Sequence, residues 1–199
     1  MWRVPGLALW LFAAPPLTAQ WSASLEVGML RYWGSSIDTA TPRDPARARP
    51  SPSTSYAARV ERRVGKIGVG VGFLYSKGGI DVGNATNTVQ EAGLLKLYEV
   101  APEISFLLAS PGPGGAVRMH VGPLFDRWQP QYEGEDPRQR VGAHAALGLD
   151  WSLGGRCGGT LKGEVAVIPG VFSAEDLPPD FARRTTWRRA VSAGVRVRL

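Results

Sequence analysis

The stretch IGVGVGFLYS, residues 67–76, decides the fold that this chain is expected to adopt. Apolar side chains recur at every second position from Ile67 to Tyr75, and glycine occupies three of the four positions between them. A period of two is typical of a β-strand, because successive side chains point to opposite faces. No helical pattern follows the alternating glycines, so the stretch does not match a dinucleotide-binding fingerprint.

The same alternation recurs in seven further runs, and no sustained 3.6-residue pattern interrupts them. These runs cover residues 21–33, 56–64, 94–108, 117–126, 141–151, 160–168 and 187–199. Most of them have the roughly 9–11 residues that a tilted strand needs to cross a membrane. The sequence therefore predicts eight strands in a single domain.

The connections between these runs alternate in length. Four are long (34–53, 78–93, 129–139 and 170–185) and three are short (65–66, 110–114 and 154–159). Short turns at one end and long loops at the other are typical of a transmembrane barrel. We therefore predict an all-β fold for residues 20–199, an eight-stranded antiparallel up-and-down transmembrane β-barrel. An even number of strands places both ends of the barrel on the periplasmic side.

The two faces of the predicted strands differ in kind. One face is apolar in mid-strand, as at Val71, Val121, Leu147 and Val195, and is expected to face lipid. Its aromatic residues gather near the strand ends, where they would form the two girdles of a membrane barrel. They are Trp21 and Trp151 at one level and Trp33, Tyr56, Tyr75, Tyr98, Phe125 and Trp187 at the other. Arg62 and Arg189 depart from this face, but near strand ends long basic side chains can reach water.

The opposite face carries equal numbers of acids and bases. The acids are Glu26, Glu61, Glu99, Glu103, Asp126, Asp150 and Glu164, and the bases are Arg59, Arg63, Arg118, Lys162, Arg188, Arg196 and Arg198. Eight strands leave an interior just wide enough for side chains to fill. We therefore expect paired charges to fill the lumen, and no open pore.

The first 19 residues have the pattern of a cleavable signal peptide. A short basic start at Arg3 precedes an uncharged, mostly apolar segment, and Ala19 supplies the small residue at the cleavage site. We predict cleavage after Ala19, with Gln20 as the mature N-terminus. An uncleaved membrane anchor is the alternative, and N-terminal sequencing distinguishes the two.

Composition restricts the remaining possibilities. The formal net charge is +6, but the basic residues are scattered and form no aromatic–basic motif, so nucleic acid is not an expected partner. The single cysteine, Cys157, cannot form an internal disulfide and is predicted to lie in a glycine-rich turn.

The chain resembles the small outer-membrane β-barrel family of the OmpA/OmpX type over roughly residues 20–199. The resemblance rests on the export junction at 17–20 (LTAQ), the strand at 98–105 (YEVAPEIS) and the terminal alternation at 191–199. It implies a bacterial outer-membrane location and folding by the barrel assembly machinery, which reads a C-terminal strand that usually ends in an aromatic residue. Leu199 departs from that pattern.

No residue set in the sequence has the pattern of a catalytic, cofactor or metal site. His120 is expected to face the lumen beside Arg118, and His144 lacks a nearby hydroxyl for a lipid-deacylase pair. The loop segment 81–88 contains oxygen ligands but lacks the charge density of a calcium loop.

The sequence thus predicts a non-enzymatic integral outer-membrane barrel with a structural role, or one that makes surface contacts through its long loops. The expected partners are outer-membrane lipids, lipopolysaccharide and, during biogenesis, the assembly machinery; no extracellular partner is specified. Two alternatives remain open: a secreted, soluble, lipocalin-like barrel that binds an apolar ligand, and an outer-membrane lipid-modifying enzyme.

Overall fold

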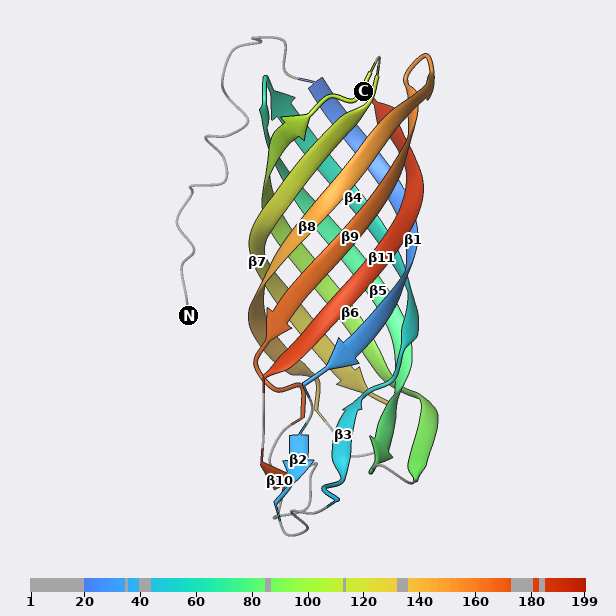
Figure 1. Cartoon of the computed structure of the whole chain (residues 1–199), viewed down its shortest axis with the longest axis vertical. Coiled ribbons are helices and arrows are strands. Elements are labelled where there is room, and N and C mark those ends of the chain that lie inside the picture. Colours follow the sequence, from blue (N-terminus) through green and yellow to red (C-terminus); the bar gives the residue numbers. More distant parts are fainter. Residues whose placement is uncertain are drawn as a thin grey trace.

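The structure is a computed structural model of the chain (Figure 1), and it describes most residues from Gln20 onward. The described ranges are 20–34, 36–39, 44–84, 87–112, 114–131, 136–172, 181–182 and 185–199. The predicted signal peptide, residues 1–19, lies outside them. In the described part of the chain, no helix is long and apolar enough to cross a membrane.

Eight long antiparallel strands form a closed ring, as predicted. They are β1 (Gln20–Trp33), β4 (Ser53–Val64), β5 (Ile67–Gly83), β6 (Thr88–Ala109), β7 (Ala116–Pro130), β8 (Arg138–Gly154), β9 (Cys157–Ile168) and β11 (Thr186–Arg198). Each pairs with its neighbour along the chain, and β1 closes the ring by pairing with β11 from Ser22–Arg198 to Trp33–Trp187. Closure gives every strand of the ring a hydrogen-bonded neighbour on both sides, and a bilayer could not supply such backbone partners.

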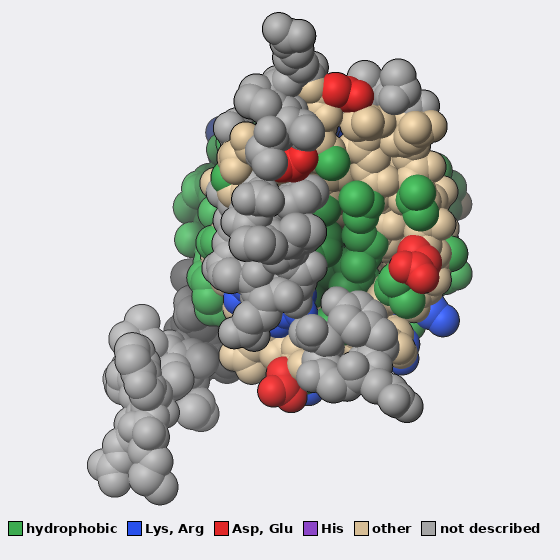
Figure 2. All heavy atoms as spheres, turned by 90° about the horizontal axis from the view of Figure 1, so that it is seen from below, with side chains coloured by type: hydrophobic (Ala, Val, Ile, Leu, Met, Phe, Trp, Pro, Cys, Tyr) green, Lys and Arg blue, Asp and Glu red, His purple; other side chains and the backbone are tan. Residues whose placement is uncertain are grey.

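The alternation of side chains separates an apolar outer surface from a polar lumen. Leu147 and Val195 are more than half exposed on the outside, whereas Glu99 and Arg118 are buried inside. Seen along the barrel, apolar side chains cover its flanks (Figure 2). The predicted assignment of the two faces is confirmed.

The short turns lie together at one end of the barrel, which we call the inner end (upper in Figure 1). Gly65 and Gly155 adopt positive φ angles of 59° and 55° in two of these turns, a conformation that glycine adopts without strain. Both ends of the barrel chain meet here, where the Leu199 amide donates to the Trp21 carbonyl at 2.9 Å.

At the opposite end, which we call the outer end, all four of the predicted long loops contain more strand than expected. Most of the predicted loop 78–93 belongs to β5 and β6, which stay paired to Gly83–Thr88 with an irregularity between Gly78 and Ile80. Glycines in this segment suggested a loop, but the backbone hydrogen bonds of the two strands continue past it. β7 and β8 likewise extend into the predicted loop 129–139.

Short strands occupy two further predicted loops. β2 (Ser36–Asp38) and β3 (Arg47–Pro50) lie within 34–53, and β10 (Phe181–Ala182) lies within 170–185. They continue the sheet beyond the ring, in the order β10, β2, β3, β5. The outer end is therefore a small sheet that rises from one side of the barrel mouth.

The predicted position of Cys157 needs a similar correction. It does not lie in a turn: the turn is Gly155–Arg156, and the exposed Cys157 is the first residue of β9, paired with Val197. Glycine-rich sequence on both sides concealed where the strand begins.

Candidate functional site: the barrel lumen

The charged residues predicted to face the lumen lie inside it. All seven acids are buried, as are Arg118, Lys162, Arg188 and Arg196. Arg59 and Arg63 are partly buried, and Arg198 is partly exposed at the inner end. All of them except Asp126 and Arg198 belong to three clusters along the barrel axis, and an apolar layer continues the filling of the lumen toward the outer end.

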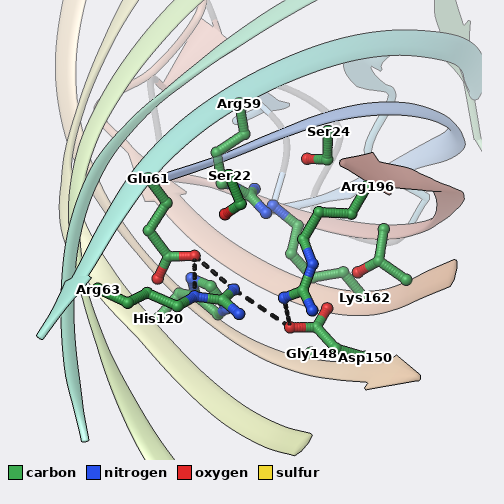
Figure 3. A pocket seen from close by; sticks show the side chains of 11 residues that line it. Ser22, Ser24, Arg59, Glu61, Arg63, His120, Gly148, Asp150, Lys162 and Arg196 are labelled. Carbon is green, nitrogen blue, oxygen red and sulfur yellow. Dashed lines mark hydrogen bonds and ion pairs between the residues drawn. The ribbon is translucent and has the colours of Figure 1, made fainter. Parts of the chain in front are cut away.

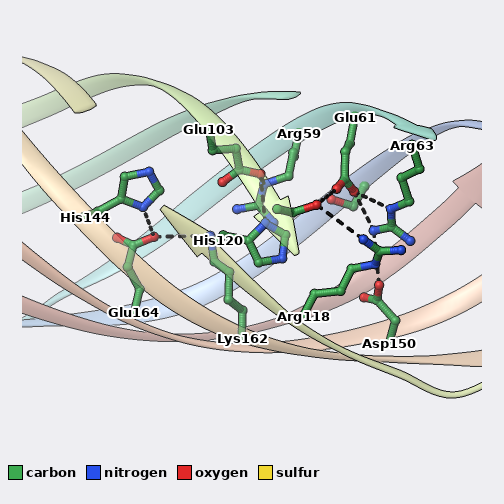
Figure 4. A network of polar contacts seen from close by, with 12 residues as sticks. Arg59, Glu61, Arg63, Glu103, Arg118, His120, His144, Asp150, Lys162 and Glu164 are labelled. Atoms are coloured by element: carbon green, nitrogen blue, oxygen red, sulfur yellow. Dashed lines mark hydrogen bonds and ion pairs between the residues drawn. The ribbon is translucent and has the colours of Figure 1, made fainter. Parts of the chain in front are cut away.

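The first cluster lies near the inner end (Figures 3 and 4). Arg63 contacts Glu61 at 2.5 Å and Asp150 at 3.2 Å, so that one guanidinium joins β4 to β8 across the lumen. Asp150 also pairs with Arg196. Ser105 donates to Glu61 and accepts a 3.4 Å bond from Arg118.

The second cluster is centred on Arg59. Its guanidinium contacts Glu103 at 2.7 Å and Glu26 at 3.1 Å. His120 Nδ1 lies 3.2 Å from Glu103, and the Ser192 hydroxyl donates to Glu26 at 2.7 Å. His120 is therefore part of the lumen network, as predicted.

The third cluster is centred on Arg188, whose side chain is completely buried. Its two terminal nitrogens donate to Glu99 at 2.5 Å and to Glu164 at 2.7 Å. Lys162 Nζ lies 3.2 Å and His144 Nδ1 3.5 Å from the other oxygen of Glu164. A guanidinium presents several donors in a fixed geometry, which lets Arg188 hold two carboxylates from different strands.

An apolar layer begins beside Arg188 and closes the lumen toward the outer end, and we call it the outer seal. It consists of Leu30, Tyr32, Leu95, Leu97, Trp128, Val171 and Ala190, all buried, with Leu74 and Ile80 packed against them. Tyr32 and Trp128 meet edge to face with ring centroids 5.8 Å apart.

Part of the outer seal comes from the segment that follows β9. Val171 and Phe172 are 1% and 4% exposed, so this segment turns back into the barrel mouth. The Arg140 side chain donates to the Gly170 carbonyl at 2.9 Å and holds the turn in place. The prediction of a lumen filled by paired charges is therefore incomplete, because its outer part is apolar.

Two cavities that described residues line inside the barrel are both small. The cavity among Arg59, Glu61, Asp150 and Lys162 offers only about 10 Å³ to the centre of a water molecule (Figure 3), which is room for about one water. The outer seal encloses a gap of the same size beside Tyr32 and Trp128.

Each of the two histidines faces a carboxylate in the structure. His120 contacts Glu103 and His144 contacts Glu164, and no bond from either ring to a hydroxyl is seen in the described residues. The described residues also contain no group of three or more His, Cys, Asp or Glu side chains placed to hold a metal ion. Through these contacts, both histidines belong to the ion-pair network of the lumen.

Two solved structures with a similar fold are bacterial surface or outer-membrane proteins. Neisserial surface protein A is 12% identical, with a TM-score of 0.62 over 90% of this chain and 97% of that chain. OprG from Pseudomonas aeruginosa is also 12% identical, with a TM-score of 0.61 over 91% of this chain and 96% of that chain. The chain thus has the fold of the small outer-membrane β-barrels, and its exposed apolar surface is that of a membrane barrel.

No protein-family model matches the sequence. No curated protein matches it either. Because one fold can carry unrelated functions, the role of this barrel has to be argued from its own lumen and surfaces.

Proposed function

We propose that the protein is an integral outer-membrane barrel without a pore or catalytic activity, which acts as a structural or surface-contact protein of the envelope. The observation that carries this proposal is the position of Arg188. Its guanidinium is completely buried between Glu99 and Glu164, directly beneath the outer seal. A solute would have to break these ion pairs and displace the packed apolar side chains to pass.

The face assignment also argues against the soluble alternative. A lipocalin-like barrel would hold an apolar ligand in an apolar interior and present charge to solvent. Here Leu25, Leu147 and Val195 are exposed on the outside, and ion pairs occupy most of the interior. This arrangement favours a barrel surrounded by lipid.

The loops at the outer end are the surfaces through which such a barrel could make contacts. An open hollow of about 380 Å³ lies between β3 and the outer part of β5, lined by Arg47, Arg49, Asp81 and Thr88 among others. Lipids, lipopolysaccharide and the assembly machinery remain the expected partners, and no extracellular partner is specified.

Planar-bilayer recording tests the closed lumen directly. We expect no stable conductance above the leak of the bilayer from purified, folded protein. Stable openings on the nanosiemens scale would contradict the proposal. Membrane fractionation, together with a shift in gel mobility on heating, tests location and barrel closure independently of conductance.

A further inference from the structure

Five basic side chains point outward near the outer end of the barrel, and we call them the basic belt. They are Arg31 on β1, Lys77 on β5, Lys96 on β6, Arg127 on β7 and Arg189 on β11. Arg31, Lys77, Arg127 and Arg189 are exposed, and Lys96 is partly exposed. Each follows the outward period of its strand, so the belt lies on the surface that carries the apolar side chains.

Two pairs within the basic belt are directly opposed across neighbouring strands. Arg31 is the register partner of Arg189, and Lys77 is the register partner of Lys96. Like charges in directly opposed positions repel and destabilise a sheet. No ion pair joins any of the five to a carboxylate in the described part of the chain, so no described acidic side chain compensates this repulsion.

Aromatic pairs place the basic belt at the membrane boundary. Trp33 and Trp187 stack at 6.1 Å, and the Arg189 guanidinium carbon lies 4.8 Å from the Trp33 ring centroid. On the other side of the barrel, Tyr75 and Tyr98 lie 5.3 Å apart.

In sequence, each opposed basic pair lies two residues from one of these aromatic pairs, or about 7 Å along the strand. Arg127 is the register partner of Tyr98. Aromatic side chains of this kind mark the level of lipid headgroups.

We propose that the basic belt binds the phosphate groups of glycolipids in the outer leaflet. This inference rests on the proposed function, because it requires the barrel to lie in the outer membrane with its long loops outward. A phosphate between two opposed basic side chains would replace their repulsion with two charge-assisted hydrogen bonds. Charge complementarity selects an anionic headgroup, and the girdle level selects a lipid rather than a soluble ligand.

The inner end provides a matched control. Arg62 on β4 also points outward, with its guanidinium carbon 5.9 Å from the Trp21 ring centroid. It shares the chemistry of the belt but lies at the opposite boundary, where its register partner is an aromatic residue and not a second base. Arg62→Gln therefore controls for the loss of any outward arginine beside a tryptophan.

The test measures binding of bis-phosphorylated lipid A to the detergent-folded protein by native mass spectrometry. We expect R31Q/R189Q and K77Q/K96Q each to weaken binding by about tenfold or more, and R62Q to leave it unchanged. The dephosphorylated lipid should bind the unaltered protein as weakly as the phosphorylated lipid binds the variant with all four substitutions. Inorganic phosphate alone should not compete at equal concentration, because the belt lies at a lipid surface.

Heat-modifiable gel mobility confirms that each variant is folded. Equal affinity for both lipids, or unchanged binding by the quadruple variant, would overturn the belt while leaving the barrel in the membrane. Failure of the unaltered protein to fractionate with the outer membrane would instead overturn the proposed function.

Discussion

The inner and outer parts of the lumen are filled with opposite kinds of side chain, although the same strands build both. From Glu61 to Arg188 most of the interior consists of ion pairs that join strands across the barrel, beside one small apolar cluster of Ala101, Leu124, Ala166 and Ile168. Toward the outer end it consists of packed apolar groups such as Leu95 and Leu97. A narrow barrel can therefore be closed in two ways, by charge pairing or by apolar packing, and this one uses both in series.

The two ways of closing respond differently to mutation. A buried charge depends on a specific partner, so its removal leaves another charge buried and uncompensated. An apolar side chain has no single partner, and its removal leaves a cavity whose cost depends on its size. Losses in the charged part should therefore be reversed by a second substitution, and losses in the outer seal should not.

The largest effect is expected for Arg188→Met. This substitution keeps much of the side-chain volume but leaves Glu99 and Glu164 without their shared guanidinium. We expect it to lower the free energy of unfolding by about 3–5 kcal/mol. Urea titration in lipid vesicles, followed by tryptophan fluorescence, measures the change.

The matched variant is R188M/E99Q, in which Glu99 is neutralised as well and Glu164 keeps its ion pair with Lys162. We expect it to regain part of the lost stability, because Glu99 no longer remains as an unpaired buried charge. A double variant less stable than R188M would show that pairing is not what holds this cluster together.

Leu97→Ala tests the outer seal in the same assay. Leu97 is 2% exposed and packs among the apolar groups of the mouth. Its truncation should cost about 2–5 kcal/mol through lost burial and the cavity left behind, whereas Leu97→Met should cost less than about 1.5 kcal/mol. Bilayer recordings of L97A should stay closed, because the ion pairs beneath the seal are intact; stable openings would make the seal the only barrier.

Alternation in the sequence was enough to predict the ring and its two faces. Period two fixes which side of a strand a residue occupies, and closure of an eight-strand ring follows from the count and the loop lengths. That is why Glu99 and Arg118 were placed in the lumen and Leu147 on the lipid side, as the structure shows.

The depth of each inward residue could not be predicted in the same way. Depth depends on how neighbouring strands are staggered around the barrel, and alternation does not determine that stagger. Leu30 and Leu97 alternate in step with the inward-facing charged residues, so alternation predicts that they face the lumen. Only the pairing of neighbouring strands shows that they lie together with Trp128. Alternation could not predict the position of Val171, because this residue lies outside the strands. It belongs to the segment after the end of β9 at Ile168, which turns back into the barrel mouth.

A third prediction extends the comparison from the lumen to the lipid side of the same strand. Leu147 is 56% exposed on the outside of β8, at a position where no partner for a charge is available in the bilayer. Leu147→Arg should cost about 2–4 kcal/mol, and Leu147→Met should be close to neutral. Vesicle unfolding experiments measure both, and equal stability of the two variants would mean that this face does not meet lipid.

The smallest effect is expected where the charged and apolar parts meet, at Asp126. Asp126 is buried and is the register partner of Glu99, yet no described cation lies within ion-pair distance of it, since Arg188 contacts Glu99 and Glu164 instead. Asp126→Asn removes one of two neighbouring carboxylates without removing an ion pair. The free energy of unfolding should therefore fall by less than about 1 kcal/mol, or it should rise. Glu99→Gln, at the opposed position, takes a charged partner from Arg188 and should cost about 1.5–3 kcal/mol. Urea titrations of the two variants side by side give the contrast, and a D126N loss as large as that of E99Q would make Asp126 a full member of the ion-pair network.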